Sequence, residues 1–125
     1  MILLIDDNKD LVNIISQYLN MVGYEARVAL SGDEGIAHAK EQKPKIILCD
    51  IGMPGMNGHE VAKYIRQNDE LKDIYLIAMS GYCSQTDVER SLEAGFDKHL
   101  SKPIDFKVIK ELIDDRESIN KLKSK

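Results

Sequence analysis

Hydrophobic residues follow two alternating periods along the 125 residues of the chain. Compact apolar runs without in-and-out alternation, such as residues 46–49 and 75–79, indicate strands that are buried on both faces of a sheet. Between the runs, apolar residues recur every three or four positions, as on the buried side of a helix. The expected strands lie at residues 2–5, 24–30, 46–49, 75–79 and 98–101.

The segment after the first strand carries the clearest helical pattern. Gly23 is expected to end this helix. The next helix should begin with a capping box formed by Ser31 and Glu34 and run to about Gln42. The inward residues expected for the first helix are Leu11, Ile14, Ile15, Tyr18, Leu19 and Val22.

Three more helices are expected, over about residues 59–68, over about residues 86–94 and from residue 104 or 105 to about Ile119. Strands and helices that alternate in this way predict an α/β domain, because right-handed crossovers place helices on both faces of a parallel sheet. Residues 1–119 are expected to form one domain, and residues 120–125 a tail or linker. The inward residues expected for these helices are Val61, Ile65, Val88, Leu92, Phe106, Ile109, Leu112 and Ile113.

Polar residues that could bind a ligand or take part in a reaction follow four of the five strands. Each has an ordinary explanation as a turn residue, a helix cap or a strand end, but their coincidence favours a site. In the strand order 2-1-3-4-5, the first and third strands are neighbours, and ligands bind where the carboxyl ends of the strands meet. These residues are Asp6-Asp7, Asp50, Ser80-Gly81 and Lys102-Pro103.

Three converging carboxylates predict a cation site. Asp6, Asp7 and Asp50 would repel one another, and Mg²⁺ is the expected ion because it accepts carboxylates while leaving room for phosphate oxygens. Calcium is less favoured, since the chain has no DxDxDG loop. Asp50 would then act as a nucleophile toward phosphorus, with Lys102 neutralising phosphoryl oxygens.

Other residues are expected to complete this site. Ser80 offers a hydroxyl group to a phosphoryl oxygen, and the turns at Gly52 and Gly81 allow their amides to approach it closely. Because of these residues together, the chain resembles a receiver domain of two-component signalling, and the resemblance covers essentially its whole length. The matching positions are Asp6-Asp7, Asp50, Met53-Pro54, Gly58, Ser80-Gly81 and Lys102-Pro103.

The resemblance implies a flavodoxin-like (βα)5 fold with strand order 2-1-3-4-5 and a role for each site residue. Asp50 would be the phosphoacceptor, and Mg²⁺ would be bound by Asp7, Asp50 and the Gly52 carbonyl, with Asp6 acting through water. Lys102 would contact the phosphoryl group, and Ser80 would supply the switch hydroxyl. The peptide bond before Pro103 is expected to be cis.

The main departure from the family is His99, which stands where receivers usually have a switching Tyr or Phe. A histidine there would couple less sharply or respond to pH. The alternative is that His99 is an edge-strand residue with no task in the switch.

The resemblance also implies partners and a setting. The phosphoryl donor would be a histidine kinase or a histidine phosphotransfer domain, and a downstream protein would bind the face formed by helix four, strand five and helix five. The run 95–103 resembles receivers of hybrid sensor histidine kinases. A net charge of −4 argues against direct nucleic-acid binding. We expect a cytoplasmic signalling domain that is not an enzyme, has no membrane segment, and is a monomer or a phosphorylation-induced dimer.

Two other functions are compatible with part of this set of residues. A phosphohydrolase of the haloacid dehalogenase type also uses an Asp nucleophile, Mg²⁺ and Lys, but it needs a second Asp where this chain has Gly52. A passive scaffold domain with a vestigial acidic cluster is disfavoured because the set of site residues is intact.

The cysteines and remaining histidines carry no expected function. Cys49 and Cys83 have no CxxC spacing, and no base adjoins Cys83 in the sequence, so a nucleophilic role has little support. His38 and His59 are expected to be exposed residues on helices.

Overall fold

The computed structural model describes the backbone of residues 1–123 and the side chains of residues 1–119, and the described chain contains each expected strand and helix. The strands are β1 (Ile2–Ile5), β2 (Ala26–Ala29), β3 (Ile46–Asp50), β4 (Tyr75–Ser80) and β5 (Lys98–Ser101). The helices are α1 (Lys9–Met21), α2 (Gly32–Gln42), α3 (Gly58–Gln67), α4 (Gln85–Ala94) and α5 (Phe106–Lys123).

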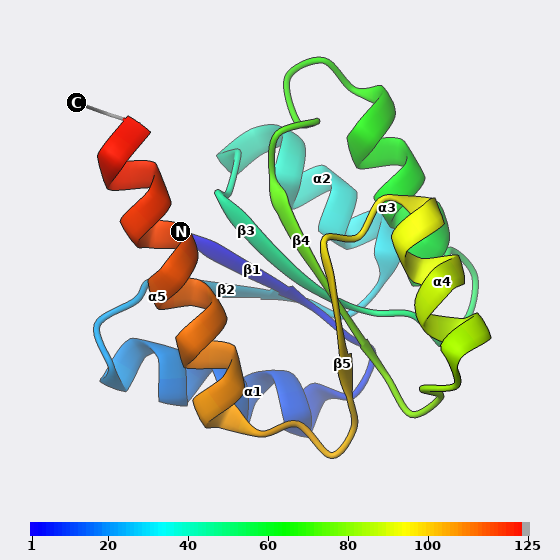
Figure 1. The fold of residues 1–125 in the computed structure, drawn as a ribbon, viewed down its shortest axis with the longest axis horizontal. Coiled ribbons are helices and arrows are strands. Elements are labelled where there is room, and N and C mark those ends of the chain that lie inside the picture. The colour runs from blue at the N-terminus through cyan, green and yellow to red at the C-terminus, as the bar shows by residue number, and fades with distance from the viewer. Residues whose placement is uncertain (124–125) are drawn as a thin grey trace.

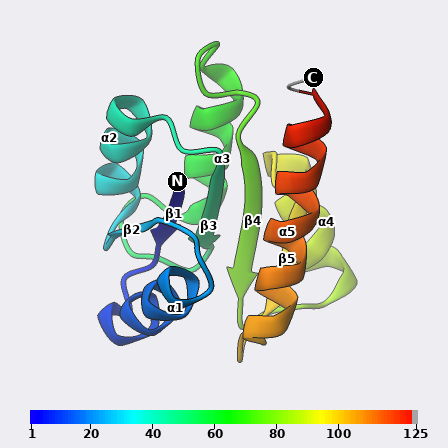
Figure 2. The ribbon, with the colours of Figure 1, turned by 90° about the vertical axis from the view of Figure 1, so that its left-hand side faces the viewer.

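The strands form one parallel sheet in the order β2-β1-β3-β4-β5, which confirms the predicted topology. Ile5 pairs with Cys49 at the ends of β1 and β3, so the residues that follow emerge next to one another. Figure 2 shows β3 and β4 pointing the same way, with their carboxyl ends at one edge of the sheet. The predicted juxtaposition of strand ends is therefore present.

Helices cover both faces of the sheet (Figure 1), as right-handed crossovers require. α1 and α5 cover one face, where Ile15 and Ile109 pack in a fully buried cluster with Leu4 and Leu48. α2, α3 and α4 cover the other face, where the buried cluster includes Ile65. The inner strands are buried on both sides, which explains their unbroken apolar sequence.

Arg66 fastens the end of α3 to its neighbours. Its guanidinium donates to the backbone carbonyls of Gly95 at 2.8 Å, Lys72 at 2.6 Å and Ile74 at 2.7 Å. It also pairs with the Asp97 carboxylate at 2.8 Å. One side chain thus satisfies several carbonyl groups where β4 and β5 begin.

Three local predictions were wrong. Ile14 and Leu92 are 51% and 47% exposed, and Val12 and Ser91 are buried in α1 and α4. Helical periodicity identifies a spacing, but packing against the sheet selects which side of the helix is buried. The predicted capping box of α2 is half formed, since Ser31 accepts from the Glu34 amide while the Glu34 carboxylate accepts from the amide of Leu30.

The last helix continues to Lys123, so the backbone of residues 120–123 is helical. The remainder of the predicted tail, residues 124–125, lies outside the described residues, and the domain boundary at residue 119 stays a prediction. Within the described chain, none of the helices combines the length and the apolar character needed to cross a membrane.

Candidate functional site

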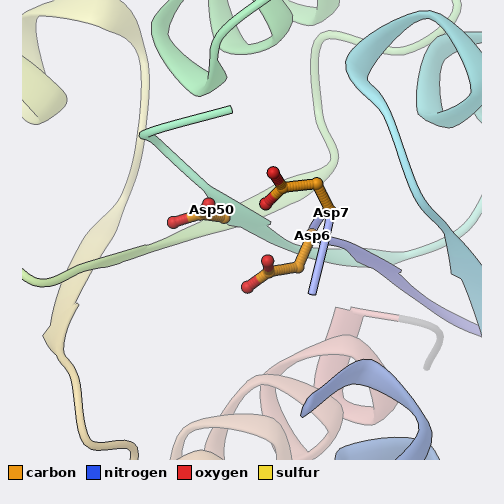
Figure 3. Close-up of side chains that lie close together, drawn as sticks. All are labelled: Asp6, Asp7 and Asp50. Carbon is orange, nitrogen blue, oxygen red and sulfur yellow. The ribbon is translucent and has the colours of Figure 1, made fainter. Parts of the chain in front are cut away.

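Three carboxylates meet at the carboxyl edge of the sheet. Asp6 and Asp7 directly follow β1, Asp50 ends β3, and each offers an oxygen within 4.8 Å of the others. Figure 3 shows the three side chains side by side at the ends of these two strands. The structure therefore brings together the residues predicted to bind a cation.

The burial of these carboxylates differs. Asp6 is fully buried, Asp50 is 6% exposed and Asp7 is exposed. Burial raises the pKa of Asp50, and the Asp6 carboxylate raises it further, while Lys102 and the Gly52 amide oppose the rise. The negative charge at Asp50 is thus incompletely compensated by the protein alone, and a cation would relieve it.

Lys102 lies between two of the acids. Its Nζ atom donates to Oδ2 of Asp6 at 3.0 Å and lies 3.1 Å from Oδ1 of Asp50. Although partial burial opposes it, hydrogen bonding to both carboxylates raises the pKa of Lys102, so the side chain carries a positive charge at neutral pH. The backbone places Lys102 here because its amide donates to the Ser80 carbonyl at 2.8 Å. The bond to Pro103 is cis, as expected.

Ser80 ends β4 and is buried beside this edge. Its Oγ accepts a hydrogen bond from the Tyr82 amide at 2.9 Å, so its own hydroxyl hydrogen is available to another acceptor. Gly81 follows on the surface, and a Cβ there would meet nothing within 4 Å. Space for an approaching group is therefore open next to the hydroxyl.

Two glycines shape the loop after Asp50 in different ways. Gly52 is exposed, and a Cβ there would meet no atom within 4 Å. Gly58 is buried at the start of α3, where a Cβ would lie 2.5 Å from the Asp50 carbonyl oxygen and 2.7 Å from Cα of Ile51. The absence of a side chain at Gly58 lets α3 pack directly against the strand end that carries Asp50.

The donor set fits Mg²⁺. Carboxylate oxygens are the ligands this hard cation prefers, and one or two carboxylates suffice because it retains several waters. The exposed Asp7 and the nearly buried Asp50 offer such oxygens from two strands. The chain therefore contains an acidic cluster of the kind predicted for this ion.

His99 on β5 joins the site to α4. Its Nδ1 lies 2.9 Å from Oγ of Ser91, and its Nε2 lies 3.3 Å from the carbonyl oxygen of Tyr82. The same Nε2 is 3.6 Å from Sγ of Cys83. His99 is half-buried on the edge strand β5 and contacts both α4 and the loop between β4 and α4, and its role in a switch stays a prediction.

Several contacts in this region could not be foreseen. Ser91 is a buried polar residue of α4 whose partner, His99, lies on another element. Cys83 has a base beside it in space, contrary to its sequence neighbourhood. His59 is half-buried, which corrects the expectation of an exposed residue, and burial, Lys63, Arg90 and His99 lower its pKa.

The predictions for two remaining side chains, Cys49 and His38, had different outcomes. Cys49 is fully buried, as expected for a core residue. His38 is half-buried, and its Nε2 lies 3.7 Å from Oε1 of Glu34. The expectation of an exposed histidine was therefore wrong for His38 as well.

Comparison with known proteins identifies relatives of this chain. The family model for the response regulator receiver domain matches residues 2–114. The polar-differentiation response regulator DivK of Brucella anthropi is 32% identical over 103 residues, which cover 82% of this chain and 84% of that protein. DivK of Brucella abortus matches at the same identity and coverage.

Solved structures match the fold closely. A CheY-like response regulator receiver domain protein from Methanospirillum hungatei superposes with a TM-score of 0.88 at 27% identity, over 98% of this chain and 96% of that one. The signal receiver domain of a histidine kinase from Syntrophus aciditrophicus gives a TM-score of 0.84 at 25% identity, over 91% and 86% of the two chains.

Proposed function

Because the chain belongs to the response regulator receiver domain family, whose members are signalling domains, we propose that Asp50 accepts a phosphoryl group. The donor is a phosphohistidine on a histidine kinase or a histidine phosphotransfer domain. The observation that carries the proposal is the position of Lys102, whose Nζ lies 3.1 Å from the Asp50 carboxylate beside the acids of β1. A nucleophile, a cation and an acidic cluster lie together at the sheet edge where ligands of such folds bind.

The transfer needs little from the protein except position and charge. An Asp50 oxygen attacks the phosphorus in line with the phosphorus–nitrogen bond of the donor, which breaks as the phosphorus–oxygen bond forms. The electron pair of the broken bond stays on the donor imidazole. Lys102 turns from the two carboxylates toward the phosphoryl oxygens, and the free Ser80 hydroxyl donates to another of them.

Mg²⁺ held by Asp7, Asp50 and the Gly52 carbonyl, with Asp6 acting through water, would supply positive charge against the phosphoryl oxygens and offset the repulsion among the carboxylates. This role is supported by the raised pKa of Asp50, which reflects burial and the charge of Asp6. The Gly52 and Gly81 turns leave open space for the donor.

A chain of contacts offers a route from Asp50 to the surface. If Ser80 turns toward a phosphoryl oxygen, its Oγ gives up the hydrogen bond from the Tyr82 amide. The Tyr82 carbonyl in turn contacts His99, which contacts Ser91 on α4. Phosphorylation would thus change the contacts of His99 and reshape the face formed by α4, β5 and α5, where a downstream protein binds.

The wider setting follows from the same proposal. The domain works in the cytoplasm, as a stand-alone regulator or as part of a hybrid histidine kinase, without direct contact to nucleic acid. It is a monomer or a dimer induced by phosphorylation. Gly52, in the position where a haloacid dehalogenase needs a second Asp, argues against a phosphohydrolase.

The test is incubation with acetyl phosphate or phosphoramidate, with Mg²⁺ or with a chelator, followed by intact mass measurement. We expect the wild type to gain one phosphoryl group only when Mg²⁺ is present, and Asp50→Asn to gain none. Asp69→Asn is the matched control, because its carboxylate is exposed and lies outside the site.

Two results would contradict the proposal. Equal phosphorylation of Asp50→Asn would remove Asp50 from the reaction, and equal phosphorylation with chelator would remove the metal. If the wild type fails to react with small donors and also with a panel of phosphorylated histidine phosphotransfer domains, the passive scaffold becomes the better account.

A further inference from the structure

Cys83 lies in the loop between β4 and α4, outside the acidic cluster. Its thiol is exposed, and Sγ lies 3.6 Å from Nε2 of His99. The other cysteine, Cys49, is fully buried, and burial with the charges of Asp50 and Asp6 raises its pKa. One thiol is thus open to solvent with a base in contact, and the other is closed.

The contacts of His99 support two tautomers. The Tyr82 carbonyl, 3.3 Å from Nε2, can only accept, so it supports a hydrogen on Nε2. When Ser91 donates its hydroxyl hydrogen to the Val88 carbonyl at 2.8 Å, its Oγ accepts from Nδ1–H of His99 at 2.9 Å, and the lone pair of the neutral ring lies on Nε2, which faces Cys83. This is the arrangement of a nucleophile, a base and a group that orients the base.

The surroundings of the thiol and the imidazole act in both directions on a proton transfer between them. Once protonated, Nε2 can donate to the Tyr82 carbonyl, which lies 3.3 Å away. Cys83 also precedes Ser84, the N-cap of α4, and a thiolate near a helix N-terminus is stabilised by the helix dipole. The Asp87 carboxylate in the first turn and the Ser80 carbonyl 3.5 Å from Sγ oppose the charge, so the contact with His99 carries the argument.

We propose that Cys83 is a modification site at which low-molecular-weight disulfides react, with His99 as the base. The Cys83 proton passes to Nε2, and the thiolate attacks one sulfur of the disulfide. A bond forms between Sγ and that sulfur while the original disulfide bond breaks. The leaving thiolate takes the proton from His99, so the products are a mixed disulfide on Cys83 and one free thiol.

Modification would reach the phosphoacceptor site through Ser80. Sγ of Cys83 contacts the Ser80 carbonyl, and Oγ of Ser80 accepts from the amide of Tyr82, the residue before Cys83. A bulky group on Sγ would displace Cys83 from His99 and from Ser80. This coupling rests on the proposed function, whereas the reaction of the thiol does not.

The test compares the reaction of oxidised glutathione with Cys83 in the folded protein and in urea, at neutral pH, with each cysteine followed by peptide mass. An exposed thiol without a base reacts no faster when folded than when unfolded. A free cysteine is only a few per cent thiolate at pH 7, so a neighbouring base can raise the reactive fraction many-fold. A more acidic thiol gives a less nucleophilic thiolate, which offsets part of this gain. We therefore expect Cys83 to react about 10-fold faster in the folded protein. Cys49 is the internal control and should react only in urea.

His99→Gln should lower the ratio of folded to unfolded rates to one or below. Ser91→Ala should lower it partly, because the ring loses its orienting acceptor, without lowering the rate in urea. A ratio at or below one in the wild type would overturn the proposal, and so would an unchanged ratio in a folded His99→Gln variant. Even if the variants fail to fold, a wild-type ratio at or below one overturns the proposal.

The coupling between Cys83 and the phosphoacceptor site is measured as the rate at which the glutathionylated protein gains a phosphoryl group from acetyl phosphate in the presence of Mg²⁺. Slower gain of the phosphoryl group, restored by a reducing agent, would support the coupling. An unchanged rate would overturn the coupling and leave Cys83 as a modification site. If neither form accepts a phosphoryl group from acetyl phosphate or from phosphorylated histidine phosphotransfer domains, the proposed function fails, and the measured reactivity of Cys83 stands independently.

Discussion

The Nζ atom of Lys102 lies 3.1 Å from Oδ1 of Asp50, and it also donates to Asp6 at 3.0 Å. One cation directly after β5 thus compensates a carboxylate that follows β1 and another at the end of β3. In this state the Lys102 ammonium group is already paired with two carboxylates. Phosphoryl oxygens must therefore compete with these carboxylates for it. Lys102 is therefore placed to act both in the resting protein and in the transfer.

Replacing Lys102 should slow phosphoryl transfer severely. In Lys102→Gln the developing charge on the phosphoryl oxygens loses a preorganised cation, and the effects of burial and of Asp6 on the Asp50 pKa are no longer opposed by a positive charge. We expect the rate with acetyl phosphate to fall about 10²-fold, as for loss of one such donor. Lys98→Gln, at an exposed position of β5, the strand that Lys102 follows, should keep the wild-type rate. A normal rate in Lys102→Gln would exclude its role.

Asp50→Asn should stabilise the metal-free protein and should reduce the stabilisation that Mg²⁺ provides. Because the pKa of Asp50 is raised in the folded state, its contribution to stability is present below the unfolded pKa and is lost as pH rises through the folded pKa. At neutral pH without metal, Asp50→Asn should therefore have the larger free energy of unfolding. Mg²⁺ at 100 times its Kd should stabilise the wild type by about 2.7 kcal/mol, and Asp50→Asn by less.

Urea unfolding with Mg²⁺ and with a chelator measures both effects. Asp7→Asn, which removes an exposed carboxylate of the same cluster, should also weaken the response to Mg²⁺. A wild type that gains no stability from Mg²⁺, or gains as much as Asp50→Asn does, would contradict the assigned metal site.

Two glycines of one loop should respond differently to alanine. In Gly58→Ala the new Cβ would lie 2.5 Å from the Asp50 carbonyl oxygen, so α3 must shift away from β3. We expect a loss of about 1–3 kcal/mol in the free energy of unfolding, typical of overpacking, and slower phosphorylation. Gly52→Ala, where the Cβ meets no atom within 4 Å, should change stability by less than about 0.5 kcal/mol. Equal stability of the two variants in urea would refute the close packing at Gly58.

Tyr24 should make stability fall at high pH. Burial and the hydrogen bond to Asp114 raise the pKa of Tyr24 to about 12. A raised pKa gives stability that is present below the unfolded value of 10.0 and is lost as pH rises toward 12. Tyr24→Phe should cost about 1 kcal/mol at neutral pH, the usual worth of one hydrogen bond.

The same variant should lose less stability than the wild type between neutral pH and the alkaline range, as measured by urea unfolding at several pH values. Parallel stability curves would show that Tyr24 ionises as freely in the folded protein as in the unfolded chain. The difference between the curves isolates Tyr24 from the lysines, which ionise in both proteins.

Strand identity and the place of the acids were predictable because they depend on local sequence. A buried parallel strand must be apolar along its length, and a polar residue that follows it must lie at the sheet edge. Asp6, Asp7 and Asp50 were found for this reason, and the neighbouring position of their strands followed from topology. Such features need no knowledge of individual side-chain contacts.

Contacts between distant elements were not predictable in the same way. Ser91 is buried because His99, on β5, supplies its hydrogen bond, and no pattern within α4 encodes that partner. The helical period of α4 pointed instead to Leu92, which lies exposed. Likewise, Cys83 acquires its base only when the β4–α4 loop folds over β5. Sequence patterns specify strands and the edges where they end, whereas tertiary packing specifies the buried side of each helix and the pairs of side chains in contact.

The central claim is that the Asp50 side chain itself carries the phosphoryl group. Sodium borohydride reduces an acyl phosphate to an alcohol and leaves a free carboxylate intact. After phosphorylation and reduction, peptide mass should therefore locate homoserine at position 50, in wild type and only with Mg²⁺. Phosphate or homoserine at Asp6, Asp7 or another residue, with Asp50 unchanged, would contradict the account.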